Sequence, residues 1–154
     1  MKCTLVPSNF FDENCAGEYL AQVFVEGPSE PVRSVLIPEY NAYLVWASDA
    51  PEGEMPEMWH VLKGLGKCPD YNKILCSWDG SELCLAIAQG KTLLLANTYQ
   101  AKDFVTAEYW IFLALRSLQL NPEISTICLR SAVSAEDEMS LYRYFKAVDC
   151  SNGQ

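Results

Sequence analysis

Three successive apolar runs near the middle of the chain show the alternation that is typical of β-strands. Residues 73–78 form the first run, and Asp79-Gly80 supplies the backbone angles that a tight hairpin turn needs. In 83–88, bulky residues alternate with small ones, so that a helix can pack closely on the small face. Residues 91–99 are apolar on both sides. The pattern predicts a meander of three strands.

A long helix is predicted next, over residues 106–120. The segment contains no Gly or Pro, Asp103 or Thr106 can cap its start, and Pro122 cannot continue it. Glu108, Arg116 and Gln119 fall within one narrow arc of the helix, which also holds Phe112. The remaining surface is apolar, so we expect it to be buried. Its residues are Tyr109, Trp110, Ile111, Leu113, Ala114 and Leu115.

The other predicted elements are short. Before the meander we expect strands over 4–7, 32–37 and 42–47 and a helix over 12–24 that Asp12 or Asn14 caps. A second helix is expected to begin at 55 or 57, to continue through 62 and to be terminated by Gly64 or Gly66. After it we expect a strand over 124–130, a helix capped by Ser134 and an edge strand over 147–149. Residues 26–31 are rich in turn formers and are the best candidate for a mobile loop.

The chain is expected to be an α/β protein in which a small α/β segment precedes the main domain. The segment covers 1–48, an acidic linker and helix cover 49–72, the core domain covers 73–150, and 151–154 is a tail. We expect one compact unit. If two lobes exist, their boundary is expected in 48–54.

Composition narrows the classes of function. The 154 residues are 50% hydrophobic, which is enough for a substantial core. A net charge of -9 with only 11 Lys and Arg argues against nucleic acid as a partner. Apolar runs are too short to cross a membrane, and the N-terminus does not resemble a signal peptide. A cytoplasmic protein is therefore expected.

Seven cysteines lack the spacing of a metal site or of a C-x-x-C motif. We expect reduced core thiols and no metal. A redox pair between Cys76 and Cys84 is the alternative, if the hairpin loop has three residues.

From residue 73 the predicted order of strand, strand, strand, helix, strand, helix, strand resembles the ribonuclease H-like fold of actin, sugar kinases and chaperone ATPases. Several short sequence segments also resemble those of a bacterial family of unknown function with an actin-like ATPase fold. They are Thr4-Leu5-Val6-Pro7, Phe11-Asp12-Glu13, Glu18-Tyr19-Leu20, Asn41-Ala42-Tyr43-Leu44-Val45, Leu93 to Tyr99, Thr106-Ala107-Glu108 and Leu118 to Glu123. The resemblance implies an actin-like fold that lacks the lobe which family members carry before this segment.

The resemblance raises the question of whether the chain binds or hydrolyses ATP. Asp79, Gly80 and Ser81 are the candidate phosphate loop, with Asp79 on the metal side and Ser81 as a phosphate contact; an ordinary turn is the simpler interpretation. The glycine pair that such ATPases place after the fourth strand is absent, because Leu129-Arg130-Ser131-Ala132 occupies that position. ATP hydrolysis is therefore not expected.

Other catalytic chemistry is disfavoured as well. A ribonuclease H-type nuclease needs carboxylates on its first strand, which instead ends in Cys76-Ser77-Trp78. Glu108 at the helix start is explained by the helix dipole, and the single histidine, His60, is interpreted as a structural or surface residue.

The sequence thus favours a non-catalytic protein-interaction or scaffold module, without cofactor, whose partner is another protein or a second copy. Trp46, Trp110 and Phe112 are the candidate interaction residues. The alternative is a degenerate regulatory domain that binds ATP and magnesium.

Overall fold

The computed structural model describes residues 3–23, 30–51 and 53–150. The chain divides into two compact units, Met1–Trp59 and His60–Gln154. The division falls inside helix α2 (Glu57–Leu65), C-terminal to the 48–54 segment in which the sequence places a boundary between lobes. Each unit is described below by itself.

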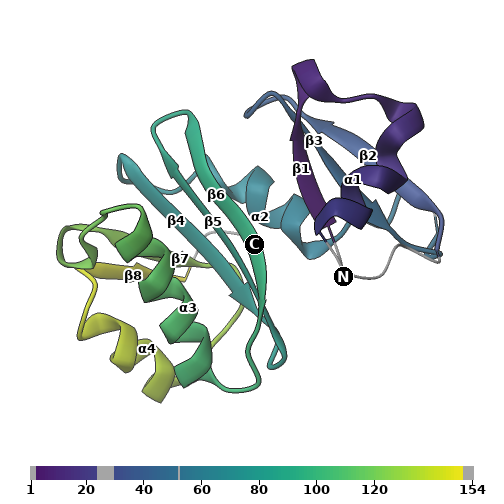
Figure 1. Cartoon of the computed structure of the whole chain (residues 1–154). Helices are drawn as coiled ribbons and strands as arrows, with labels where there is room; N and C mark the ends of the chain where they lie inside the picture. Colours follow the sequence, from purple (N-terminus) through teal and green to yellow (C-terminus); the bar gives the residue numbers. More distant parts are fainter. Residues whose placement is uncertain (1–2, 24–29, 52, 151–154) are drawn as a thin grey trace. The chain divides into compact units, whose positions relative to one another are not determined.

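The first unit is a small antiparallel sheet with one helix. Its strands lie in the order β1-β3-β2, so β2 forms one edge. The elements are β1 (Cys3–Pro7), α1 (Ala16–Val23), β2 (Val32–Ile37) and β3 (Ala42–Ala47). One face of the sheet packs on α1, because Val6 and Val45 form an apolar cluster with Ala16 and Leu20 of the helix region (Figure 1).

Helix α1 begins later than the sequence predicts. The carboxylate of Asp12 accepts a hydrogen bond from the amide of Asn14 and starts a short 3-10 turn, Glu13–Cys15, before the α-helix begins at Ala16. Asp12 is therefore a cap, as expected, but of this turn. The predicted last residue, Phe24, and positions 26–29 of the predicted loop lie outside the described residues.

The second unit contains a five-stranded sheet in the order β6-β5-β4-β7-β8. The strands are β4 (Asn72–Trp78), β5 (Glu82–Gln89), β6 (Thr92–Gln100), β7 (Thr126–Leu129) and β8 (Ala147–Asp149). β5 is antiparallel to its neighbours, whereas β7 and β8 continue parallel to β4. This is the expected ribonuclease H-like arrangement, in which a meander is followed by two helical crossovers.

Helices α3 (Phe104–Ser117) and α4 (Ala135–Tyr142) provide these crossovers and cover the same face of the sheet (Figure 1). Both connections step the chain in one direction across the sheet, and right-handed crossovers then place both helices on one side. A single apolar core lies beneath them. It includes Ile74, Leu85, Ile111, Ile127 and Leu141.

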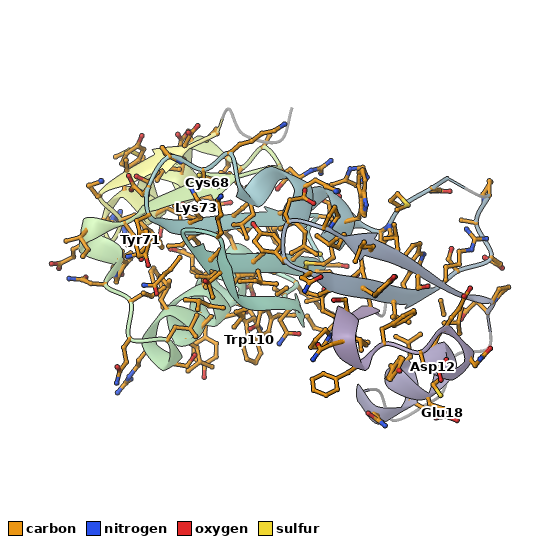
Figure 2. The ribbon with its side chains drawn as sticks, turned by 90° about the horizontal axis from the view of Figure 1, so that it is seen from above. Asp12, Glu18, Cys68, Tyr71, Lys73 and Trp110 are labelled. Carbon is orange, nitrogen blue, oxygen red and sulfur yellow. The ribbon has the colours of Figure 1, made fainter. Side chains whose placement is uncertain are left out.

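The opposite face of this sheet is contacted by the C-terminal part of α2. A Cβ atom added at Gly64 would lie 3.0 Å from the Cδ2 atom of Leu75, so the helix backbone approaches β4 closely. Leu75 pairs with Ala86 of β5, which confirms that the small-residue face of β5 lies on the side of a closely packed helix. The turn into β4 is held by Lys73, whose amine donates to the carbonyls of Cys68 and Asp70 (Figure 2).

Helix α3 is capped as predicted, but its solvent-facing side differs from the prediction. The Asp103 carboxylate accepts a hydrogen bond of 2.7 Å from the amide of Thr106. Glu108, expected in an exposed polar arc, is only 8% exposed, whereas Tyr109 and Leu113, expected to be buried, are 59% and 42% exposed. The physical reason is that the flat apolar surface formed by Phe104, Ala107, Ile111 and Ala114 packs on the sheet and fixes the rotation of the helix.

Among the described residues, no helix has the length and apolar character needed to span a membrane.

Candidate functional site

The Asp79-Gly80-Ser81 hairpin is an internally hydrogen-bonded turn. One carboxylate oxygen of Asp79 accepts the amide of Ser81 at 2.8 Å and the amide of Glu82 at 2.7 Å. Gly80 has a φ of 95°, which favours glycine. The two amide hydrogen bonds hold the pKa of the Asp79 carboxyl below its usual range.

These contacts bear directly on the phosphate-loop hypothesis. Backbone amides that bind phosphate must point outward to the ligand, but those of Ser81 and Glu82 point to the Asp79 side chain. At the neighbouring end of β7, the hydroxyl of Ser131 accepts the amide of Trp78 at 2.9 Å. No cluster of three or more metal-binding side chains occurs within 3–23, 30–51 and 53–150.

Glu108 is held between the two helices of the second unit. Its carboxylate lies 2.9 Å from the hydroxyl of Ser140 on α4, and burial raises its pKa despite this hydrogen bond. The acid therefore points to α4, and the first strand, β4, carries Cys76, Ser77 and Trp78 where a nuclease would carry a carboxylate. The Glu108 carboxylate is thus engaged by a side chain of α4, and β4 offers no carboxylate at Cys76, Ser77 or Trp78.

The predicted alternative of a Cys76–Cys84 redox pair is wrong. Cys76 lies opposite Leu85, and Ser77 lies opposite Cys84, because the register at the hairpin pairs Trp78 with Leu83. Neighbouring positions of a strand point to opposite faces, so the two thiols lie on different sides of the sheet. Burial, together with the thiols of Cys128 and Cys84, raises the pKa of Cys76 to about 12.

The three candidate interaction residues occupy different environments. Trp46 is 3% exposed and therefore forms no surface in the first unit. Trp110, which Figure 2 labels, stacks on Tyr99 of β6 with 4.9 Å between ring centroids, and its indole nitrogen donates to the carbonyl of Gln100. Phe112 contacts the ring of Tyr144 at 4.8 Å. Trp110 and Phe112 thus connect α3 to β6 and to the region after α4.

Between these two aromatic contacts lies an exposed apolar stripe on α3. Val105, Tyr109 and Leu113 are 77%, 59% and 42% exposed, and their spacing of four residues places them on one side of the helix. We call these three residues the α3 stripe. Arg116, which is also exposed, follows one turn later on the same side. Single exposed apolar residues are normal, but an aligned set on a solvent-facing helix is typical of a contact surface.

The prediction from sequence did not find the α3 stripe, because the polar residues were taken to mark the solvent side. The sequence nevertheless contains a signal for the side of α3 that faces the sheet. Ala107 and Ala114 are small residues seven positions apart, which is the spacing that a helix uses to approach a sheet closely. With those alanines placed inward, Tyr109 and Leu113 point outward.

Comparison with known proteins supports the fold. No protein-family model matches the sequence, and no curated protein matches it. The structure is similar to the crystal structure of a Bacteroides thetaiotaomicron VPI-5482 protein with an actin-like ATPase fold and unknown function, with a TM-score of 0.78 and 17% sequence identity. The match covers 96% of this chain and 64% of that chain. The chain has an actin-like ATPase fold. This likeness confirms the fold expected from the sequence segments and carries no activity with it, and the chain spans less than two thirds of that protein's length.

Proposed function

We propose that this chain is a cytoplasmic, non-catalytic protein-interaction module that self-associates through the α3 stripe. The observation that carries the proposal is the alignment of Val105, Tyr109 and Leu113 on the exposed side of one helix. Burying such side chains against a partner contributes about 25 cal/mol for each Å² of apolar surface removed from water.

A second copy of the chain fits this surface because the stripe is self-complementary. Tyr109 lies midway between Val105 and Leu113, so a two-fold axis beside Tyr109 places Val105 of one copy against Leu113 of the other. The dipoles of the two helices are also opposed in this arrangement.

The alternative function, binding of ATP and magnesium at Asp79, Gly80 and Ser81, is supported less well. The Asp79 carboxylate already accepts two backbone amides of its own turn. A nucleotide would have to displace these hydrogen bonds before the loop could contact a phosphate. We therefore propose a module that works without a nucleotide cofactor.

Sedimentation velocity over a range of protein concentrations tests the self-association. We expect a monomer–dimer equilibrium that Tyr109→Glu weakens by at least about tenfold, because two carboxylates would then meet at the axis. Met139→Glu is the matched control, since Met139 is 62% exposed and belongs to α4, not to the α3 stripe.

A wild-type chain that stays monomeric at the highest attainable concentration would overturn the proposal, as would equal weakening by Met139→Glu and Tyr109→Glu. Thermal unfolding with and without Mg-ATP tests the alternative separately. A rise in melting temperature with Mg-ATP that Asp79→Ala abolishes would favour the nucleotide-binding domain.

A further inference from the structure

The first unit contains a cavity along the β2 edge of its sheet, where no described strand pairs with β2. The cavity has a volume of about 790 Å³, which is in the range of ligand sites. Four consecutive residues of β2, Val32 to Val35, line it. The remaining lining comes from Glu13 and Ala16, from Trp46 of β3, and from Gly53, Glu54 and Met55. All of these residues belong to Met1–Trp59.

The hydrogen-bond pattern shows which backbone groups of β2 face this cavity edge. The amide of Ser48 donates to the carbonyl of Pro31 at 2.9 Å, so these residues form a hydrogen-bonded pair between β3 and β2. Hydrogen-bonded and non-hydrogen-bonded pairs alternate along an antiparallel ladder. With the observed register, Arg33 and Val35 bond to β3, whereas the N–H and C=O groups of Val32, Ser34 and Leu36 point away from it.

Two side chains around the cavity have hydrogen-bond donors that are not all used. The indole nitrogen of Trp46 is buried and has no hydrogen-bond acceptor among the residues that the structure describes. Trp46 lies directly opposite Arg33 in the sheet. The Arg33 guanidinium donates to the carbonyls of Ala50 and Pro51, and no described carboxylate pairs with it. A guanidinium has five N–H donors, so donors remain for an acidic group.

We propose that this cavity binds an extended peptide segment that adds to β2 as a further strand and presents an acidic side chain to Arg33. Outward-facing N–H and C=O groups at alternate residues are the groups with which an added strand pairs. The side chains of the added strand would point alternately to the two faces of the sheet. Glu13 and Glu54 also line the cavity and would repel further negative charge, so the peptide is expected to carry one acidic side chain, placed beside Arg33.

The site is independent of the α3 stripe, which lies in the other unit, so either proposal can fail alone. The test begins with a phage-displayed library of random heptapeptides, selected on the wild-type chain and on Ser34→Pro. Proline removes the Ser34 N–H that faces the β2 edge, and it leaves the hydrogen bonds from Arg33 and Val35 to β3 in place. We expect peptides with Glu or Asp among alternating β-branched residues, enriched on the wild-type chain only.

The selected peptide is then synthesised and followed by amide hydrogen exchange. Binding should protect the amides of Val32, Ser34 and Leu36 and leave those of Arg33 and Val35 unchanged. Arg33→Gln should weaken binding about tenfold for the acidic peptide and little for its Gln counterpart. Amide signals of β3 report whether each variant is folded. The proposal is overturned if no peptide is enriched on the wild-type chain and absent from the Ser34→Pro selection. It is also overturned if the bound peptide protects amides outside β2 from exchange.

Discussion

The hydroxyl of Ser140 on α4 lies 2.9 Å from both carboxylate oxygens of Glu108 on α3. A hydroxyl carries one hydrogen, so it donates to one oxygen at a time. Burial raises the pKa of Glu108, and the nearby charge of Asp137 acts in the same direction. This contact links the two helices that cover the sheet, but it does so with an acid whose charged form is disfavoured by its surroundings.

The substitution Glu108→Gln should therefore stabilise the protein at neutral and alkaline pH. An acid with a raised pKa binds its proton more tightly in the folded state, so stability falls as the pH rises from the unfolded pKa, about 4.3, through the folded value. Glutamine accepts the Ser140 hydrogen bond without a charge. We expect a gain of about 1 kcal/mol at pH 8 that vanishes below pH 4, measured by urea unfolding.

Ser140→Ala provides the complementary measurement. It removes the donor and leaves the Glu108 carboxylate buried, so it should cost about 1 to 3 kcal/mol at pH 8. In the Glu108→Gln background the cost should be smaller, because no charge is left without its donor. If Glu108→Gln lowers stability at pH 8 but not below pH 4, the carboxylate charge is stabilising and this account is wrong.

For the Asp79 turn we expect the opposite dependence of folding stability on pH from that of Glu108. Its folded pKa is lowered, so the stability that the carboxylate contributes is present above the unfolded pKa of about 3.9 and is lost as the pH falls through the folded value. Asp79→Ala should cost about 1 to 2 kcal/mol at pH 7 and much less in strong acid. Asp79→Asn, which keeps the accepting oxygen, should cost less. The control is Asp49→Ala, which changes an exposed acid outside the turn and should leave urea unfolding nearly unchanged.

The sequence predicted the elements that local chemistry determines. The Asp79-Gly80 turn, the alternation in β5 and the caps Asp103 and Ser134 are signals within a few residues, and each occurs in the structure where it was expected. Strands 32–37 and 42–47 were predicted with the bounds that the structure has. Together with the order of elements, these signals are sufficient for the ribonuclease H-like topology.

Features that depend on distant partners were not predictable in the same way. Glu108 looks like a surface residue until Ser140, 32 positions later, is placed beside it. The register of Cys76 and Cys84 is set at the hairpin, where Trp78 pairs with Leu83, and a shift by one position reverses the face of every side chain. The β2-edge cavity depends on residues from three separate segments, so only the structure brings Glu13, Arg33 and Glu54 together.

Thiol reactivity should follow burial closely. Cys68, Cys76 and Cys128 are buried, whereas Cys150 is exposed. Because partial burial and the Glu138 carboxylate raise the pKa of Cys150, its reaction with iodoacetamide should be slow at pH 7 and accelerate as the pH rises. Mass spectrometry of the folded protein should find the label on Cys150 and absent from Cys76. Rapid labelling of Cys76 without unfolding would contradict its placement in the core.

The stack of Trp110 on Tyr99 should contribute to the docking of α3 beside β6. The rings lie 4.9 Å apart with an angle of 16° between their planes, and the Trp110 indole also donates to the Gln100 carbonyl at 3.1 Å. Trp110→Phe removes the donor but keeps an aromatic ring, so it should cost about 0.5 to 1.5 kcal/mol. A double-mutant cycle with Trp110→Ala and Tyr99→Ala should give a coupling energy of about 0.5 to 1.5 kcal/mol in urea unfolding. A coupling energy near zero would mean that the two rings contribute only through the apolar area that each buries independently.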